Sequence, residues 1–405
     1  MQLSLNREKI VGLAYAVGSE EILANMPNQP VMQCFDSRVV EFLDALSLEL
    51  LKNREAKQYP DVVTFGFWVR KSNILLLKNK YCNNDSSVFV QGRGMAFHVA
   101  PSNVPVNYAY SLVTGLLCGN ANVIKIPSKN FRQVELINEA INKCLKDNPY
   151  MQSYIVLVQY GHENEINEAL SEYADARVIW GGDQTIKEIR KAPLHARAVE
   201  VDFADRYSLA VIDSDEYIAI ENKKKVALDF YNDTYLTDQN ACTSPRMVIW
   251  MGNKKEEAKE AFWTELHALV KDKYQFQPIQ AVNKLTSGYL LAATMEHCHR
   301  VMVEDNLVVR MQVNQIDDSI MELKDNSGYF FEYDCEQLQE LKEVCDNTHC
   351  QTLSYIGNSA KFQKLLELGV KGVDRIVPIG KTMDFEFIWD GYNLIQQLTR
   401  TIRLG

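Results

Sequence analysis

One cysteine of the chain lies in a short polar loop, within the stretch DQNACTSPR at residues 238–246. A helix-like stretch at residues 223–236 precedes this loop, and the apolar run MVIWMG at residues 247–252 predicts a buried strand after it. Backbone N–H groups in a loop stabilise a thiolate and lower its pKa, and a thiolate attacks thioesters and aldehydes. Cys242 is therefore a candidate nucleophile. The alternative, a small buried residue, holds for most cysteines.

An asparagine, Asn103, lies between two prolines in PSNVP at residues 101–105. The prolines restrict the chain and hold the asparagine at the end of an expected strand. A side-chain amide in that place can donate a hydrogen bond to a developing oxyanion. The alternative is a turn or helix N-cap residue, because asparagine is common at both.

Lys125 and Ser128 belong to VIKIPSKN at residues 123–130, where an apolar strand ends in a polar turn. A lysine inside an apolar strand is costly to bury unless its ammonium group reaches the edge of the sheet. At that edge it would bind a ribose hydroxyl or a phosphate group. The alternative is a lysine of an edge strand that lies in solvent.

A pair of glycines, Gly181 and Gly182, follows the apolar stretch ARVIW at residues 176–180. Two glycines at the end of a strand let the backbone approach a bound group closely, and the helix expected after them offers free N–H donors. The pair is not part of a GxGxxG fingerprint, so a plain tight turn explains it equally well.

Two histidines and three carboxylates are candidates for acid–base chemistry. His98 lies inside an expected strand, which favours a core histidine, and His162 follows another strand. The carboxylates of Glu163, Glu200 and Asp202 have no clear partner in the sequence.

Two short stretches combine side chains that ligate metals, namely EHCH at residues 296–299 and Cys345 with the pair His349-Cys350. Adjacent residues of a helix point in different directions, so the first stretch cannot close a site without ligands from elsewhere. We therefore predict no metal site.

Charge and composition argue against several classes of function. The net charge is -10 and no basic block occurs, which argues against nucleic acid as a partner. No apolar run reaches the roughly 18 to 20 residues of a membrane span, and the N-terminal stretch MQLSLNREKIVGLAYAVG lacks the pattern of a signal peptide. The nine cysteines are irregularly spaced and form no CxxC motif, which predicts free thiols and a cytoplasmic location.

The elements that must position these residues alternate from about residue 94 onward. Apolar stretches that favour strands are separated by amphipathic stretches that favour helices, and the strands are expected at residues 94–101, 122–128, 153–161, 176–182, 198–203 and 208–213. This alternation gives a parallel sheet covered by helices on both faces, whose ligands bind beyond the carboxyl ends of the strands. The turns at residues 101–103, 127–129 and 181–183 are therefore expected at one functional edge.

A second series of strands and helices follows the Cys242 loop. Its strands are expected at residues 247–252, 306–313, 351–357 and 374–380, its helices at 254–274, 335–345 and 359–369, and a short helix at the tail, 394–405. We predict an α/β protein with two doubly wound domains, residues 1–225 and 226–380, and a C-terminal segment, 381–405, that packs back or contributes to oligomerisation. Because Cys242 opens the second domain, it is expected to face the first domain across a cleft.

Three of these stretches, taken together, resemble motifs of the aldehyde dehydrogenase superfamily. They are residues 97–130 with Asn103 and Lys125, the turn VIWGGDQT at 178–185, and the loop DQNACTSPR. Within that superfamily the chain resembles the acyl-CoA reductases typified by the reductase of bacterial luminescence systems (LuxC-type). That likeness rests on APSNVPV, on NACTSPR and on GVDRIVPIGKTMDFEFIWDGYNLI at residues 372–395, and it covers the chain from about residue 90 onward.

The resemblance implies an oxidoreductase with a Rossmann-like cofactor domain and a catalytic domain. It implies that Cys242 is acylated by a fatty acyl thioester, that Asn103 and the Cys242 N–H stabilise the oxyanion, and that NADPH or NADH is the reductant. Lys125 would contact the adenosine ribose or its phosphate, and Gly181 and Gly182 would lie near the pyrophosphate. The acyl donor would be acyl-CoA, an acyl carrier or a partner acyl-protein synthetase, and the protein would be a dimer or tetramer.

Two departures from the superfamily pattern bear on the direction of catalysis and on the cofactor. Members that oxidise aldehydes carry a glutamate in an ELGG-like stretch, whereas the corresponding stretch here, residues 199–208, has Glu200 and Asp202 but no glycine pair. This favours reduction of an acyl group, because excluding activated water protects an acyl-enzyme. Ser128 stands where NAD-preferring members often carry a glutamate, which favours NADPH. An aldehyde dehydrogenase that releases an acid, and an acyl-transfer subunit without reductase activity, remain the alternatives.

Overall fold

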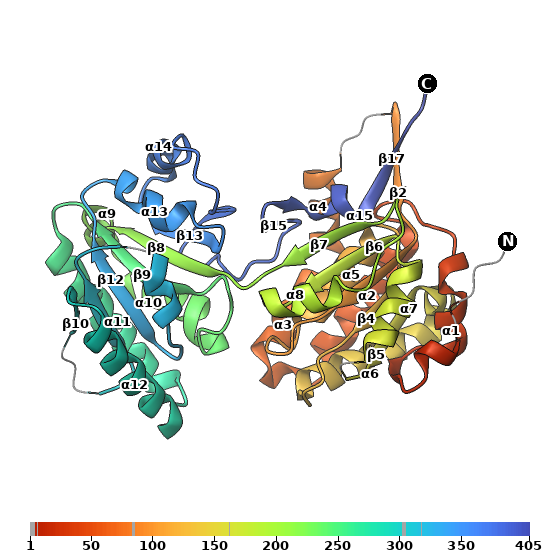
Figure 1. Cartoon of the computed structure of the whole chain (residues 1–405), viewed down its shortest axis with the longest axis horizontal. Coiled ribbons are helices and arrows are strands. Elements are labelled where there is room, and N and C mark those ends of the chain that lie inside the picture. Colours follow the sequence, from red (N-terminus) through yellow and green to blue (C-terminus); the bar gives the residue numbers. More distant parts are fainter. Residues whose placement is uncertain (1–4, 6, 83–85, 162, 302–304, 317) are drawn as a thin grey trace. The chain divides into compact units, whose positions relative to one another are not determined.

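The computed structural model describes residue 5 and residues 7–82, 86–161, 163–301, 305–316 and 318–405. The chain forms two compact units, each with its own sheet (Figure 1). Unit 1 consists of Met1–Ala204 and Glu386–Gly405, and unit 2 of Asp205–Phe385. The chain therefore crosses between the units twice, after Ala204 and after Phe385.

The sheet of unit 1 has the strand order β1-β5-β4-β3-β6-β7. Its strands are β1 (Ala14–Val17), β3 (Met95–Val99), β4 (Ala121–Lys125), β5 (Ile155–Gln159), β6 (Ala176–Trp180) and β7 (Val199–Phe203). All neighbours are parallel except β1, which runs antiparallel to β5. The central strands β3 and β6 are buried along their whole length, as expected for a sheet covered on both faces.

The helices of unit 1 are α1 (Glu20–Asn25), α2 (Ser37–Lys52), α3 (Pro60–Trp68), α4 (Lys71–Tyr81), α5 (Asn107–Leu117), α6 (Arg132–Asp147), α7 (Asn164–Tyr173), α8 (Asp183–Ile189) and α15 (Leu394–Leu398). Helix α2 shows why such segments fold. The Asp36 carboxylate caps it by accepting a hydrogen bond from the N–H of Arg38, 2.9 Å away. Its apolar residues recur at helical spacing and are buried, including Val39, Phe42, Leu43, Leu46 and Leu50.

The order of the strands in unit 1 places the three predicted turns at one edge. From β3 the chain builds outward to β4 and β5 on one side, and then to β6 and β7 on the other. The sheet order thus reverses between β3 and β6, and ligands of open α/β sheets bind beside such a switch point. The turns at 101–103 and 181–183 follow these two strands, and the turn at 127–129 follows the neighbouring β4.

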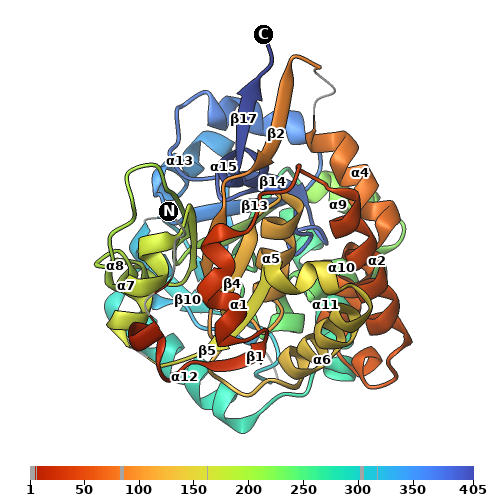
Figure 2. The same ribbon diagram turned by 90° about the vertical axis from the view of Figure 1, so that its right-hand side faces the viewer.

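Two small sheets complete unit 1. Strands β2 (Val88–Gly92) and β17 (Thr399–Arg403) form an antiparallel ribbon that projects from the unit, with the C-terminus at its tip (Figure 2). Strands β15 (Ile388–Trp389) and β16 (Tyr392–Asn393) form a short hairpin. The prediction of a helix over the whole tail is wrong for its second half, since Thr399, Thr401 and Ile402 are β-branched and pair with the free edge of β2.

The sheet of unit 2 has the order β10-β11-β12-β9-β8-β13-β14. Its strands are β8 (Tyr207–Asp213), β9 (Pro245–Met251), β10 (Cys298–Arg300), β11 (Val309–Val313), β12 (Tyr329–Asp334), β13 (Cys350–Ile356) and β14 (Arg375–Pro378). Only β10 is antiparallel to its neighbour. The helices are α9 (Ser214–Ala219), α10 (Lys223–Thr234), α11 (Lys255–Lys273), α12 (Pro278–Thr294), α13 (Lys342–Asp346) and α14 (Gln363–Leu366).

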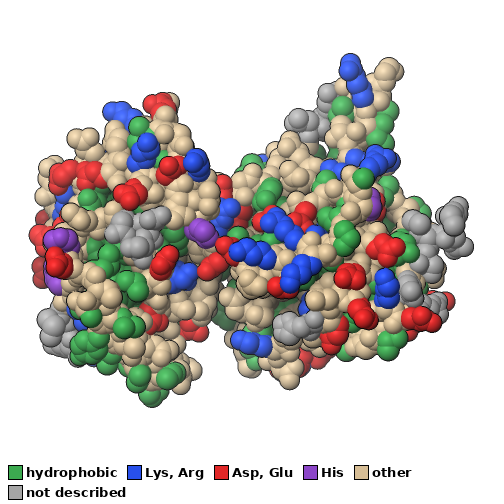
Figure 3. All heavy atoms as spheres, viewed as in Figure 1, with side chains coloured by type: hydrophobic (Ala, Val, Ile, Leu, Met, Phe, Trp, Pro, Cys, Tyr) green, Lys and Arg blue, Asp and Glu red, His purple; other side chains and the backbone are tan. Residues whose placement is uncertain are grey.

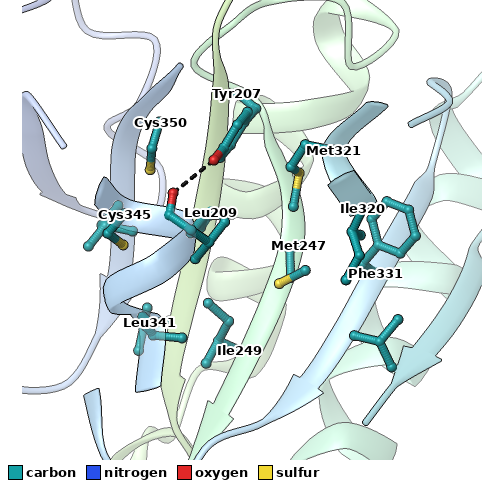
Figure 4. Close-up of a cluster of buried hydrophobic side chains, with 14 of the residues drawn as sticks. Tyr207, Leu209, Met247, Ile249, Ile320, Met321, Phe331, Leu341, Cys345 and Cys350 are labelled. Atoms are coloured by element: carbon teal, nitrogen blue, oxygen red, sulfur yellow. Dashed lines mark hydrogen bonds between the residues drawn. The ribbon is translucent and has the colours of Figure 1, made fainter. Parts of the chain in front are cut away.

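Apolar side chains fill both faces of the unit 2 sheet. Along β8, Leu209 and Val211 join the core of one face, whereas Ala210 and Ile212 join the core of the other. This alternation follows from the two-residue period of a strand. Figure 4 shows the first core, in which Leu209, Met247, Ile249 and Phe331 lie together.

The borders of the two units differ from the predicted domain boundaries at residues 225 and 380. Strand β8 was expected to complete the first sheet, but it pairs with β9 and β13 in the sheet of unit 2, so the first border lies at residue 204. The second lies at residue 385, because Phe387 packs against the rings of Phe35, Trp68 and Tyr81 in unit 1. Helix α12 and strand β12 have no counterpart in the prediction.

Surface and side-chain chemistry match an ordinary globular protein. On the face drawn in Figure 3, acidic and basic side chains are interspersed over both units. No helix within the described ranges is both long and apolar enough to cross a membrane. All nine cysteines are free thiols. Within the same ranges, no three His, Cys, Asp or Glu side chains are grouped so as to hold a metal ion.

Candidate active site

Cys242 lies half-buried in unit 2, in the loop between helix α10 and strand β9. The Ser208 hydroxyl donates a hydrogen bond to the Cys242 carbonyl at 2.7 Å. The N–H of Ser244 donates to the carbonyl of Ala241 at 3.0 Å, which closes a tight turn around the cysteine. The Thr243 hydroxyl lies 3.2 Å from the sulfur of Met383. The fold thus fixes the backbone that carries this thiol.

Gln239 anchors the first end of the Cys242 loop. Its side chain is wholly buried, and its Nε2 donates to the carbonyls of Pro245 and Tyr329 at 2.9 and 3.0 Å. Its Oε1 accepts from the N–H groups of Gly328 and Tyr329 at 3.0 and 3.1 Å. Asp238 and Gln239 both have left-handed backbones, with φ of 51° and 58°. Four hydrogen bonds to strand ends hold this strained turn in place.

Arg246 and Asn326 anchor the other end of the loop. The Arg246 side chain, only 5 % exposed, donates from one terminal nitrogen to the Oδ1 of Asn326 at 2.8 Å and to the carbonyl of Asp325 at 3.2 Å. The amide of Asn326 in turn donates to the Oδ1 of Asn240 at 2.7 Å. Asn326 therefore ties the residues before and after Cys242 to one another.

Arg246 also sets the electrostatics around the thiol. Burial lowers the pKa of Arg246, and the charges of Cys242, Asp205 and Asp325 oppose that shift, so the guanidinium lies within electrostatic range of the Cys242 sulfur. A guanidinium stays protonated in proteins. The charges of Arg246 and Cys242 therefore interact.

Helix α12 makes hydrogen bonds to the turn at residues 325–327 that contacts Arg246. The buried Lys284 ammonium donates to the carbonyl of Ser327 at 2.7 Å and to that of Asn306, and burial lowers the pKa of Lys284 to about 7. The Ser287 hydroxyl donates to the carboxylate of Asp325 at 2.7 Å. The turn that holds Arg246 is thereby fastened to a helix.

In unit 1, Asn103 lies exposed in the bend between β3 and α5. The N-cap residue of α5 is Val106, so Asn103 does not cap this helix. The bend leads into a buried helix at the switch point of the sheet, and the asparagine amide faces solvent there. Of the alternatives for Asn103, the N-cap is wrong, whereas a turn residue and an oxyanion donor both fit.

Lys125 ends strand β4, at the edge of the unit 1 sheet where the predicted turns lie. Its ammonium donates to the carbonyl of Gly161 at 2.6 Å and lies 4.1 Å from the centre of the Tyr160 ring. Burial lowers the pKa of Lys125, and the charge of Glu163 opposes this. The alternative of a lysine free in solvent is therefore wrong. Ser128 lies exposed in the turn beyond it.

Gly182 is a glycine that the fold itself does not require. A Cβ atom built there meets nothing within 4 Å, and its φ of −64° suits any residue. A Cβ on Gly181 would lie 3.0 Å from the side chain of Thr185, so this glycine has a packing role. Gly182 is exposed at the switch point of the sheet, beside which ligands of open α/β sheets bind.

The remaining acid–base candidates have structural roles or lie beyond what the structure describes. His98 is wholly buried, its ring nitrogens contact Ser111 and Asn122 at 2.8 and 3.1 Å, and burial lowers its pKa to about 4. It is a neutral core histidine, as predicted. His162 lies outside the described residues.

The two carboxylates Glu200 and Asp202 have partners that sequence reasoning missed. Glu200 accepts from Arg177 at 2.7 Å and from Arg190 at 2.6 Å, and Asp202 accepts from Arg190 at 2.8 Å. Both are therefore committed to ion pairs within unit 1.

Comparison with known proteins places the chain in a family. The family model described as acyl-CoA reductase (LuxC) matches residues 72–401. The chain belongs to the acyl-CoA reductase (LuxC) family. Among relatives, a long-chain acyl-protein thioester reductase of Aliivibrio fischeri is 25% identical over 262 residues, which are 62% of this chain and 52% of the relative. One from Photorhabdus laumondii is 23% identical over 328 residues, or 76% of this chain and 63% of the relative. The chain thus spans between half and two thirds of these relatives.

Solved structures show the fold of this family member to be that of aldehyde dehydrogenases. Aldehyde dehydrogenase 21 from Physcomitrella patens, in complex with succinate, superposes with a TM-score of 0.65 at 13% identity, covering 94% of this chain and 88% of that one. An NADP-dependent glyceraldehyde-3-phosphate dehydrogenase from Bacillus halodurans, complexed with NADP, gives 0.62 at 13% identity, with 95% and 92% covered. The predicted fold class is confirmed.

The structure distributes the predicted site residues of this LuxC-family chain over both units. Asn103, Lys125, Ser128 and the glycine pair share one edge of the unit 1 sheet, and Cys242 lies in unit 2. Sequence reasoning missed Ser208, Arg246 and Asn326. Arg246 lay inside the quoted motif NACTSPR, where a charged residue entering a buried strand was a usable signal. Ser208 and Asn326 act through contacts distant in sequence.

Proposed function

We propose that the protein reduces a fatty acyl thioester to an aldehyde through a thioester on Cys242. The observation that carries the proposal is the setting of this cysteine. A half-buried thiol lies in a loop fixed at both ends by hydrogen bonds of buried side chains, and the charge of one of them, Arg246, interacts with that of Cys242. A core cysteine needs neither feature, and membership of the LuxC family supports the same reading.

In this proposal the Cys242 thiolate attacks the carbonyl carbon of the acyl thioester. The Asn103 amide and the Cys242 N–H donate hydrogen bonds to the oxyanion that forms. When the oxyanion collapses, the bond to the donor sulfur breaks, the donor thiolate leaves, and the acyl group remains on Cys242. A bound nicotinamide would supply the hydride that converts this acyl group to an aldehyde. Cleavage of the carbon–sulfur bond then returns the Cys242 thiolate.

The ion pairs of Glu200 and Asp202 support reduction over oxidation. A general base that activates water needs a carboxylate free to accept a proton. Arg177 and Arg190 already occupy both carboxylates. Neither of these two carboxylates is then free to activate water, which supports an aldehyde product over an acid.

The edge of the unit 1 sheet fits a dinucleotide. The space over Gly182 admits a close approach of the pyrophosphate, and the half-buried Lys125 has donors left for a ribose hydroxyl or a phosphate. Ser128 cannot repel a 2′-phosphate as a carboxylate would, which favours NADPH over NADH. These residues would bind and orient the cofactor.

The partners follow from the same proposal. The relatives named above are acyl-protein thioester reductases, so an acyl-protein is a donor to test beside acyl-CoA. The β2–β17 ribbon projects from unit 1 and suits assembly into a dimer or tetramer. A cytoplasmic location agrees with nine free thiols.

Incubation with a panel of acyl donors and both reduced nicotinamides tests the proposal. The panel would contain acyl-CoAs of increasing chain length and an acylated carrier protein. We expect loss of cofactor absorbance that matches the aldehyde formed, mole for mole. Formation of an acid from added aldehyde and oxidised cofactor would instead show an aldehyde dehydrogenase. Acylation of Cys242 without consumption of cofactor would show an acyl-transfer subunit.

A further inference from the structure

Two cysteines of unit 1, Cys34 and Cys82, lie on segments that pack against the same aromatic ring, that of Phe387. Cys34 belongs to a segment that is bound to the middle of strand β2, where its N–H donates to the carbonyl of Val90 at 3.0 Å. Cys82 is the C-cap residue of helix α4, and its N–H donates to the carbonyl of Lys78 at 2.9 Å. The two thiols interact, since each shifts the pKa of the other, that of Cys34 upward and that of Cys82 downward.

The neighbours of both cysteines confirm that these segments meet. Phe35 follows Cys34, and Tyr81 precedes Cys82. Both rings pack edge-on against the ring of Phe387, with centroid distances of 6.0 Å from Phe35 and 5.4 Å from Tyr81. One aromatic ring thus holds the two cysteine-bearing segments against each other.

The two thiols differ in access to solvent. Cys34 is buried at 6 % exposure, whereas Cys82 is half-exposed at the end of its helix. The interaction with Cys34 and the charge of Lys78 lower the pKa of Cys82. An accessible thiol of this kind, beside a second cysteine, is the arrangement found in redox-sensitive pairs.

A second pair in unit 2 provides the contrast. The thiols of Cys345 and Cys350 also interact, since Cys345 raises the pKa of Cys350, but both residues are fully buried. Figure 4 shows them within the core beside Leu341 and Tyr207. An oxidant in solution cannot reach that pair in the folded protein.

We infer that Cys34 and Cys82 form a reversible dithiol–disulfide pair that responds to hydrogen peroxide. The Cys82 thiolate attacks one peroxide oxygen, the O–O bond breaks, hydroxide leaves, and Cys82 becomes a sulfenic acid. The Cys34 sulfur then attacks the Cys82 sulfur, water leaves, and the disulfide forms. A dithiol reductant restores both thiols by exchange.

The disulfide would act on the segment where the chain re-enters unit 1. Glu386, the first residue after the second crossing, accepts from the Lys80 ammonium at 2.7 Å and from the Tyr81 hydroxyl at 2.8 Å. Both donors precede Cys82 at the end of α4. A bond from Cys82 to Cys34 would therefore clamp the helix end that holds this re-entry segment.

Peroxide treatment of the full chain, followed by mapping of disulfide-linked peptides, tests the inference. The Cys242→Ser variant is the starting protein, so that the outcome does not depend on the proposed catalytic role of Cys242. We expect a Cys34–Cys82 linked peptide that dithiothreitol removes, while Cys345 and Cys350 stay reduced. A third cysteine, the buried Cys118, interacts electrostatically with both Cys34 and Cys82. Oxidation of Cys345 and Cys350 first, a bond from Cys82 to Cys118, or sulfinic acid at Cys82 without any disulfide would each overturn the inference.

Thermal unfolding provides a second readout that needs no catalytic activity. The cross-link closes a long loop in unit 1, and we expect peroxide to raise Tm by about 5 °C or more in a manner reversed by dithiothreitol. The same protein carrying Cys34→Ser should show no such rise. A disulfide that leaves Tm unchanged would contradict the clamping of the α4 end.

Discussion

The Cys242 loop and the turns at the edge of the unit 1 sheet are built in opposite ways. The loop is held by buried side chains, with Gln239 and Arg246 making hydrogen bonds on either side of the cysteine. The turns that carry Asn103, Ser128 and Gly182 are exposed. Within the described ranges, side-chain hydrogen bonds there are few: the Lys125 ammonium donates to the carbonyl of Gly161 at 2.6 Å, and the Gln159 amide donates to that of Pro127 at 2.8 Å. One region is fixed by the fold, and the other is open to a ligand.

This difference separates two kinds of contribution to one reaction. A nucleophile must stand ready before the substrate arrives, so its support belongs to the folded core and contributes to stability. Residues that contact a cofactor gain their partners only on binding, so their replacement leaves stability nearly unchanged. Substitutions in the two regions should therefore differ in whether they change folding, turnover or cofactor affinity.

The largest effect is expected from Cys242→Ser. A serine hydroxyl stays protonated where a thiol ionises, so acylation by a labelled acyl donor should be lost and turnover should fall at least about 1,000-fold. Melting temperature should change little, because serine is close to cysteine in size and the Ser208 hydroxyl still holds the backbone carbonyl of residue 242.

Cys298→Ser is the matched control for this variant. Cys298 is also half-buried in unit 2, but burial raises its pKa to about 11. Its replacement should leave acylation intact. Labelling that persists in Cys242→Ser and disappears in Cys298→Ser would identify Cys298 as the nucleophile in place of Cys242.

Asn103→Ala should lower kcat about 100-fold, the usual loss for an oxyanion donor. The Asn103 side chain is exposed and does not cap α5, so the free energy of unfolding should not change. Ser102→Ala, in the same exposed bend, is the control and should keep its activity. A loss below about threefold in Asn103→Ala would show Asn103 to be a turn residue only.

Gln239→Ala tests whether the nucleophile loop is held by the core. The change leaves two N–H groups and two carbonyls without their buried partner, and we expect a loss of about 2 kcal/mol in the free energy of unfolding. Denaturant titration measures this. Asn240→Ala, which removes one hydrogen bond from an exposed residue, should cost less than about 1 kcal/mol. Equal costs would mean that the loop owes little to its buried anchor.

Local patterns predicted most of the unit 1 sheet and the chemistry at its edge. The strands from β3 to β7 were predicted because each short apolar run is followed by a polar turn. Strand β8 was predicted in the sheet of unit 1, which is wrong. Its apolar run is compatible with either sheet, and only its pairing with β9 and β13 shows that it belongs to unit 2.

The supports of the nucleophile loop were harder to predict, because they depend on contacts distant in sequence. Helix α12 carries a single charged residue, Lys284, and that residue is buried, so the usual alternation of polar and apolar faces is weak there. The partner of Arg246 lies in the turn at residues 325–328, far along the chain. Hydrophobic periodicity within a segment does not predict contacts between residues that lie far apart in the sequence.

The smallest effect is expected from Lys125→Met, which tests the open region alone. Methionine keeps the apolar stem of the side chain but loses the ammonium that reaches the edge of the sheet and would contact the ribose or its phosphate. We expect KM for the reduced nicotinamide to rise about tenfold, about 1.4 kcal/mol, with kcat nearly unchanged, because that contact is made equally before and during the reaction. Lys129→Met, in the exposed turn after Ser128, should change KM less than about twofold. If both variants leave KM unchanged, the cofactor binds elsewhere. If Lys125→Met lowers the free energy of unfolding instead, the hydrogen bond from Lys125 to Gly161 stabilises the fold. The two regions then differ less in their contribution to stability than their difference in exposure indicates.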